Sequence, residues 1–295
     1  MDLLVLAAGM GSRFGGLKQV EPVGPNGEVI LDYSVYDAIK AGFKKVVFII
    51  KKENLSVFEE NVGKRLRRYV EIDYAFQDIK DTPITVDVER LKPWGTVQAI
   101  LCAKNKIDDN FAVINADDFY GRDAFYKAYD ELVKLNADNK YSAVLYEAKG
   151  TLSANGKVKR GICITKDGNI KNIIESSVYE KDNKLMCEPL DGSNAFESDL
   201  ESLVSMNMFL FNKSVFPLLE VYFKKFLETT GDLSKDESLI STFVDDMIKE
   251  GVIDLKYVST NSKWYGITFR EDLDEVKEGI LKLIQDDVYQ NDLWG

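Results

Sequence analysis

The chain of 295 residues contains no histidine. This absence excludes Ser-His-Asp and Cys-His catalytic arrangements, His-ligated zinc sites and histidine-based pH switches. There are only 3 cysteines, an odd number without the spacing of a metal site, so we expect reduced thiols in a reducing compartment. Any chemistry must therefore use carboxylates, lysine, arginine, hydroxyls, backbone groups or a bound metal.

Long apolar runs and excess basic charge are also missing. No apolar stretch is long enough to span a membrane, and the N-terminal residues lack the basic region of a signal peptide, so we expect a cytoplasmic protein. Acidic residues outnumber basic ones by 49 to 38, which gives a formal charge of −11 and argues against nucleic-acid binding, since that needs a basic surface. With 45% hydrophobic and 29% charged residues, the composition is that of a globular protein with a substantial core.

The first half alternates between apolar runs and helical patterns. Continuous apolar runs are typical of strands buried on both faces and occupy residues 3–8, 46–50, 111–114 and 142–145. Helical spacing of apolar residues covers 33–41, 54–66, 96–103 and 124–135. This alternation predicts a doubly wound α/β sheet.

The pattern changes after Gly150. Short strands at 161–164, 172–174 and 185–187, separated by turns at 166–169 and 181–183, predict a β-meander insertion. Residues 189–202 are polar and acidic, and we expect a mobile loop there. A strand at 204–211, helices at 215–226 and 237–248, a strand at 253–258 and a final helix at 273–285 complete the prediction of one domain with a β-rich substrate lobe from about residue 150.

The strongest local feature is the glycine-rich segment Leu-Ala-Ala-Gly-Met-Gly-Ser-Arg-Phe-Gly-Gly-Leu-Lys at 6–18. Its glycines let the backbone approach phosphate oxygens, and Arg13 and Lys18 add cations, so phosphate binding is favoured over a tight turn with solvated basic residues. A P-loop is excluded because Gln19 follows the lysine, and a dinucleotide fingerprint because prolines and glycines at 22–27 prevent the required helix. What remains is a loop that wraps around a nucleoside triphosphate before a first helix near Asp32.

This segment resembles the signature of the nucleotidyltransferases that make nucleotide sugars, the nucleotide-sugar pyrophosphorylases. The resemblance implies a Rossmann-like, doubly wound mixed sheet of the nucleotide-diphospho-sugar transferase type. It implies a single nucleotidyltransferase domain over 1–295, with a nucleotide-binding part at 1–149 and an acceptor-binding part with the C-terminal helix at 150–295. It makes Arg13 and Lys18 catalytic, and it gives the loop's nucleotide contacts to Leu6, Ala8, Gly9, Gly11 and Ser12.

Further pieces resemble the family's nucleotide site. Gln77, after a strand predicted at 69–76, matches a glutamine that contacts the nucleobase. In the Gly-Thr-Val-Gln-Ala segment at 95–99, Gly95 would let a base or ribose approach the backbone, and Thr96 can cap the helix. Asp117, at the carboxyl end of a buried strand, matches the family's Mg²⁺-binding aspartate. The role of Asp118 is open between supporting the metal and contacting a ribose.

In the acceptor part, Gly161, Glu175 and Asn207 match the family's sugar-binding positions. Two departures stand out. Ser176 replaces a lysine that many sugar-phosphate thymidylyltransferases carry, so the sugar phosphate must meet Arg160, Lys159 or Lys263 instead. The segment 263–268 also lacks the family's second metal carboxylate, and Asp272 beyond it reads as an acid at a helix start.

The resemblance implies Mg²⁺-dependent in-line transfer of a nucleotidyl group from a nucleoside triphosphate to a sugar 1-phosphate. The alternatives are a cytidylyltransferase acting on phosphocholine or another alcohol phosphate, with Trp264 and Tyr265 as candidate contacts for a quaternary ammonium, and a non-catalytic nucleotide-sugar-binding regulatory homologue. An NADP-binding oxidoreductase is a distant further alternative. The partners are thus a nucleoside triphosphate and a phosphorylated small-molecule acceptor, with no nucleic acid and no membrane; the sequence leaves a homo-oligomer open.

Overall fold

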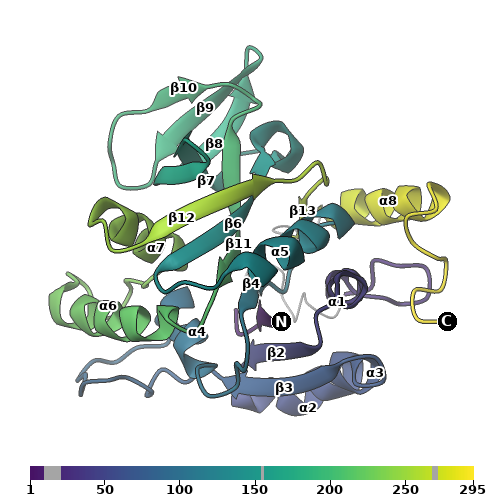
Figure 1. The fold of residues 1–295 in the computed structure, drawn as a ribbon, viewed down its shortest axis with the longest axis horizontal. Helices are drawn as coiled ribbons and strands as arrows, with labels where there is room; N and C mark the ends of the chain where they lie inside the picture. Colours follow the sequence, from purple (N-terminus) through teal and green to yellow (C-terminus); the bar gives the residue numbers. More distant parts are fainter. Residues whose placement is uncertain (10–20, 154–155, 268–271) are drawn as a thin grey trace.

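The computed structural model describes residues 1–9, 21–153, 156–267 and 272–295. Its strands are β1 (Asp2–Leu6), β2 (Lys45–Ile50), β3 (Glu71–Phe76), β4 (Phe111–Asn115), β5 (Asp118–Phe119), β6 (Lys140–Glu147), β7 (Val158–Lys166), β8 (Asn169–Lys181), β9 (Lys184–Pro189), β10 (Phe196–Ser198), β11 (Leu203–Phe211), β12 (Asp254–Ser259) and β13 (Tyr265–Gly266). Within these ranges eleven strands form one sheet in the order β10-β9-β8-β12-β6-β11-β4-β1-β2-β3, with β7 paired to β11 and β8 (Figure 1). β5 and β13 form a separate two-stranded ribbon.

Helices cover both faces of this sheet. They are α1 (Ile30–Ala41), α2 (Leu55–Phe58), α3 (Lys64–Leu66), α4 (Thr96–Cys102), α5 (Arg122–Lys134), α6 (Val215–Thr229), α7 (Ile240–Lys249) and α8 (Asp272–Gln285). Along β1, Leu3 and Val5 pack into one core cluster with α1 and α5, while Leu4 packs into a second cluster with α4, α6 and α7. The apolar run at the start of the chain is therefore buried on both faces, as predicted. No described helix is long and apolar enough to cross a membrane.

Strand direction divides the sheet. β1 pairs in parallel with β2 and β4, and β2 pairs in parallel with β3. β11 runs antiparallel to β4 and to β6. β12 pairs in parallel with β6. The sheet is thus mixed, with the parallel strands β4, β1, β2 and β3 at one end and the hairpin strands β7, β8 and β9 toward the other (Figure 1).

The predicted turns of the β-rich part are present. Between β7 and β8, Asp167 and Gly168 have φ values of 52° and 74°, and between β8 and β9, Asp182 and Asn183 have 51° and 60°. Positive φ at both central residues matches the right-handed twist of the flanking strands, and Asp, Asn and Gly tolerate this conformation best.

Two predicted segments differ in detail. The loop expected at 189–202 contains β10, because Phe196 pairs opposite Cys187 and packs against the core. Phe196 and Leu200 both pack against the core, and these apolar contacts hold the stretch against the sheet edge. The helix expected at 54–66 is broken into α2, a π-helical turn (Glu59–Gly63) and α3.

The C-terminal segment packs onto α1, and Figure 1 shows the C-terminus beyond α8 on that side of the molecule. The Tyr289 hydroxyl donates to Asp37, and Trp294 Nε1 donates to Asp32 Oδ1 at 3.3 Å. Trp294 also stacks on Tyr69 with ring centroids 4.6 Å apart. Asp32 and Asp37, two buried residues of α1, thus attach the C-terminal segment to that helix.

Asp37 should make stability depend on pH. Its carboxylate is fully buried and accepts from Arg122 Nε at 3.1 Å, but burial raises its pKa to about 6, above the usual value near 4. The folded chain binds a proton on Asp37 more tightly than the unfolded chain does. The contribution of Asp37 to the free energy of unfolding is therefore fully present below about pH 4 and is lost as the pH rises through about 6. Urea unfolding of Asp37→Asn should show a weaker pH dependence than wild type. The exposed Asp254→Asn is the control, and equal slopes in all three proteins would contradict this.

Candidate active site

The parallel strands end level with one another. Leu6 pairs with Ile49 and Asn115, and the ladder continues where Ala7 N donates to Ile49 O at 2.9 Å and Gln77 N donates to Ile50 O at 3.0 Å. The residues predicted after β1, β3 and β4 are thereby brought to one edge of the sheet, where open α/β sheets bind ligands.

The start of the glycine loop reaches this edge. Leu6 is half-buried, Ala8 is buried and Gly9 is exposed. No described atom lies within 4 Å of where a Cβ on Gly9 would be. Gly11, Ser12, Arg13 and Lys18 lie outside the described residues.

Gln77 and Gly95 are in direct contact. Gln77 Nε2 donates to the Gly95 carbonyl at 3.1 Å. Gly95 has φ 102°, and a Cβ there would lie 2.4 Å from the Ser238 carbonyl oxygen. Glycine is therefore required at 95 both by the backbone conformation and by the neighbouring chain.

Thr96 does not cap its own helix. Gly95 occupies the N-cap of α4 without a side-chain bond, and Thr96 Oγ1 instead accepts from Ile240 N, the first residue of α7, at 2.7 Å. The reason is that the backbone of Ser238 runs alongside: Ser238 N donates to Trp94 O and Val97 N donates to Ser238 O. The same pairing starts α7 at Ile240 rather than at the predicted residue 237.

Asp117 and Asp118 follow β4. Asp117 is half-buried, and its carbonyl accepts from Ile267 N at 3.4 Å. Asp118 is buried on β5, where Asn115 Nδ2 donates to its Oδ2 at 2.9 Å. Both carboxylates thus belong to the strand edge that carries Gly9 and Gln77.

The position opposite Asp118 is Gly266 of β13. A Cβ on Gly266 would lie 2.2 Å from the Trp264 ring and 3.1 Å from Asp118 Oδ1. The space that a side chain at position 266 would need is therefore filled by the Trp264 indole and the Asp118 carboxylate.

A cavity of about 350 Å³ lies beside Asp118 and joins the two halves of the chain. Gly161, Glu175 and Asn207, the three predicted acceptor residues, all line it. Its other lining residues are Asn115, Asp118, Lys157, Val158, Lys159, Arg160, Ser177, Ser205, Met206 and Trp264. The carboxylates, amides and hydroxyls gathered here are groups that bind a polyol.

Glu175 and Gly161 stand opposite each other on β8 and β7. A Cβ on Gly161 would lie 2.8 Å from Ile173 Cγ2 and 3.2 Å from Glu175 Oε1, so glycine makes room for the carboxylate. Burial raises the pKa of Glu175, while a Ser241 hydrogen bond and the charge of Lys159 lower it.

Asn207 lies at an irregularity in β11. The β11–β6 register shifts between Ser205 and Phe209, and Asn207 has φ 62°. The buried Tyr120 hydroxyl fixes this bulge beside β4, since it accepts from Asn115 N at 3.0 Å and donates to Met206 O at 2.9 Å. Bulges of this kind re-aim a side chain, and they are frequent next to active sites.

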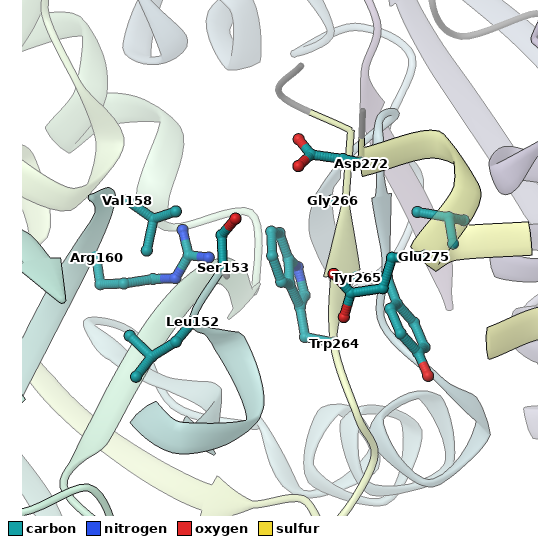
Figure 2. A pocket seen from close by; sticks show the side chains of 10 residues that line it. Leu152, Ser153, Val158, Arg160, Trp264, Tyr265, Gly266, Asp272 and Glu275 are labelled. Atoms are coloured by element: carbon teal, nitrogen blue, oxygen red, sulfur yellow. The ribbon is translucent and has the colours of Figure 1, made fainter. Parts of the chain in front are cut away.

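The three cations offered by the sequence have different surroundings. Arg160 is buried and donates to the Thr151 and Lys159 carbonyls. Its guanidinium carbon lies 4.4 Å from the centroid of the Trp264 ring, and Figure 2 shows the two side chains close together. Both line a small cavity of about 30 Å³. Burial lowers the pKa of Arg160 to about 10. Lys263 Nζ lies 3.3 Å from Glu275 and 4.6 Å from the Tyr265 ring centroid, at a different cavity. Lys159 alone of the three is an exposed residue that lines the cavity beside Asp118.

Sequence reasoning missed part of the lining. Lys157, Ser177, Ser205 and Asn115 were not singled out. A signal was present for two of them. Ser177 is two residues along β8 from Glu175 and so shares its face, and Lys157, directly before β7, is two residues from Lys159.

A profile of the nucleotidyl transferase family matches residues 3–282. The chain therefore belongs to that family, as the glycine loop suggested. The bifunctional protein GlmU of Methanocaldococcus jannaschii is 24% identical over 291 residues, 98% of this chain and 56% of the relative, so this chain spans little more than half the length of that protein.

Three solved structures share the fold. A protein assigned as a glucose-1-phosphate thymidylyltransferase from Bacillus anthracis, in complex with sucrose, has a TM-score of 0.63 and 18% identity, covering 94% of each chain. The inositol-1-phosphate CTP transferase from T. maritima has 0.66 and 14%, covering 96% of each. A UDP-glucose pyrophosphorylase bound to UDP-glucose has 0.62 and 18%, covering 95% of this chain and 98% of the other.

Asn207 gives a test of the bulge. A left-handed conformation costs a residue with a Cβ about 1 kcal/mol, and Asn tolerates it better than Ala. Asn207→Ala should therefore unfold at a lower urea concentration than Asn207→Gly, although both lose the amide. Equal stability of the two variants would show that the bulge relaxes without Asn207.

Proposed function

We propose that the chain transfers a nucleotidyl group from a nucleoside triphosphate to a sugar 1-phosphate, giving a nucleoside-diphosphate sugar and pyrophosphate. The observation that carries this is the polar cavity with Glu175 and Asn207 directly beside Asp118, at the strand edge of a nucleotidyl transferase fold. An oxygen of the acceptor phosphate attacks the α-phosphorus, and the bond from that phosphorus to the bridging β-phosphate oxygen breaks.

The nucleotide-binding and acceptor-binding parts that we propose correspond to different parts of the sheet. We assign nucleotide binding to residues 1–149 and infer a Rossmann-like half there, which the parallel pairing of β1, β2, β3 and β4 supports. Residues 150–295 contribute β7, β8 and β11 to the acceptor cavity. Three free thiols support a cytoplasmic location, because that compartment keeps them reduced.

Catalysis here rests on positioning and charge. The acceptor phosphate is largely ionised near neutral pH, with a second pKa of about 6, so no general base is needed and the lack of histidine costs nothing. We assign Arg13 and Lys18 to the charge on the reacting and leaving phosphates, since phosphoryl chemistry depends on electrostatic stabilisation.

The carboxylates of Asp117 and Asp118 fit Mg²⁺, which prefers one or two carboxylates plus phosphate oxygens and water. Asp117 would hold this ion, which would supply charge neutralisation on the triphosphate.

The cavity favours a polyol over a quaternary ammonium. Binding a choline group requires free aromatic faces. The Trp264 face already carries the Arg160 guanidinium and the Tyr265 face carries Lys263. We therefore place a sugar phosphate, or a cyclitol phosphate like that named for the T. maritima protein, ahead of phosphocholine.

A matrix of nucleoside triphosphates against phosphorylated acceptors, with Mg²⁺ and read by pyrophosphate release, tests the reaction. We expect release with one or two triphosphates and a sugar 1-phosphate or cyclitol phosphate, and none with phosphocholine. Arg13, Lys18 or Asp117 variants should lose turnover while remaining folded, whereas Asp254→Asn keeps it. Nucleotide binding without release for any pair would favour the regulatory homologue, and normal turnover of Asp117→Asn would refute the metal assignment.

Lys159 should bind the acceptor phosphate. The Ser176 side chain does not reach the cavity. It is buried on the opposite face of β8, and its hydroxyl donates a hydrogen bond to the Ile174 carbonyl. Lys157 pairs with Glu188 at 2.6 Å, whereas Lys159 has no ion pair within the described ranges. Loss of a charged hydrogen bond should raise the acceptor KM of Lys159→Gln by about tenfold, with the triphosphate KM unchanged. Lys157→Gln is the control, and an equal or larger effect there would reverse the assignment.

A further inference from the structure

Gln98 is a buried polar residue inside α4. Its side chain is 1% exposed, and its Nε2 donates to the Asp78 carbonyl at 2.7 Å and to the Asp81 carbonyl at 3.1 Å. Backbone carbonyls only accept hydrogen bonds. The amide nitrogen of Gln98 must therefore face the 78–81 turn, and its oxygen must face the other way.

That oxygen accepts from Gln77. Gln77 Nε2 lies 2.8 Å from Gln98 Oε1 and 3.1 Å from the Gly95 carbonyl. Both partners can only accept in this arrangement, so both hydrogens of the Gln77 amide are engaged. Rotating the Gln77 amide by half a turn would place its oxygen against two acceptors, which is unfavourable. The orientation of Gln77 is thus fixed by Gln98.

Two groups are left for a ligand beside this pair. Within the described ranges, neither Gln77 Oε1 nor the Gly95 N–H has a hydrogen-bond partner. Gly95 is a buried residue, and buried backbone N–H groups are nearly always paired. An acceptor with a fixed orientation and a backbone donor are therefore available on two residues that are in direct contact at the carboxyl end of β3.

We propose that Gln98 is a specificity-determining positioning residue, which holds Gln77 so that its carbonyl oxygen, with the Gly95 N–H, contacts the nucleobase. The proposal rests on the proposed function. Each base presents N–H donors and acceptors in its own order along the edge that pairs in nucleic acids. A locked acceptor–donor pair accepts one order, whereas a freely rotating Gln77 amide could exchange acceptor for donor and would accept more than one.

Gln98→Met removes the lock while keeping the length of the side chain. We expect the ratio of kcat/KM between the preferred and the next-best triphosphate to fall by about tenfold or more, since discrimination by a fixed hydrogen-bonding group is lost. Leu101→Met, one turn along α4, is the matched control and should keep the ratio. In a Gln77→Met background, Gln98→Met should change the ratio no further, because its effect acts through Gln77.

A purely structural role for Gln98 would lower stability but leave the ratio unchanged, and this outcome would overturn the proposal. If Gln98→Met does not fold, the wild-type protein answers the same question. The side-chain NH₂ protons of Gln77, identified by their loss in Gln77→Met, should be protected from exchange without nucleotide and should stay so when the preferred triphosphate binds. Loss of protection, or a new hydrogen bond from this NH₂ to the base, would refute it. Absence of wild-type turnover with every triphosphate would instead reject the proposed function.

Discussion

The level ending of the parallel strands is the constraint on which the rest of the site depends. Leu6 pairs with both Ile49 and Asn115, so the chain leaves β1, β2 and β4 at the same height. A slip of one residue in any of these strands would turn its side chains to the wrong face. Burial of β1 on both faces makes such a slip costly, because Leu3, Leu4 and Val5 are all fully buried.

The cavity beside Asp118 lies next to this strand edge. Its shape depends on places where the strands depart from regular geometry. The bulge at Asn207 and the missing Cβ at Gly161 create polar space within an otherwise continuous sheet. The Arg160–Trp264 stack then closes one side of that space. Regular strands thus form the walls of this space, and a few irregular positions shape it.

Much of the architecture could be read from local pattern. The apolar run after Met1 predicted a strand buried on both faces, and the turns at 167–168 and 182–183 were identifiable from Asp, Asn and Gly. Contacts between distant segments could not be read in this way. Thr96 caps α7 rather than α4, and Gly95 is held against Ser238, because tertiary packing brings together residues more than a hundred positions apart. Likewise, Gln98 looked like an ordinary helical residue, and only its partners Gln77 and Asp78 show what its amide does.

Gly266 has a consequence for how this chain can change over evolutionary time. The indole of Trp264 and the carboxylate of Asp118 occupy the volume that any side chain at 266 would need, and the indole is itself held under Arg160. A single mutation from glycine to aspartate would collide with both neighbours, so its effect depends on residues that must change first.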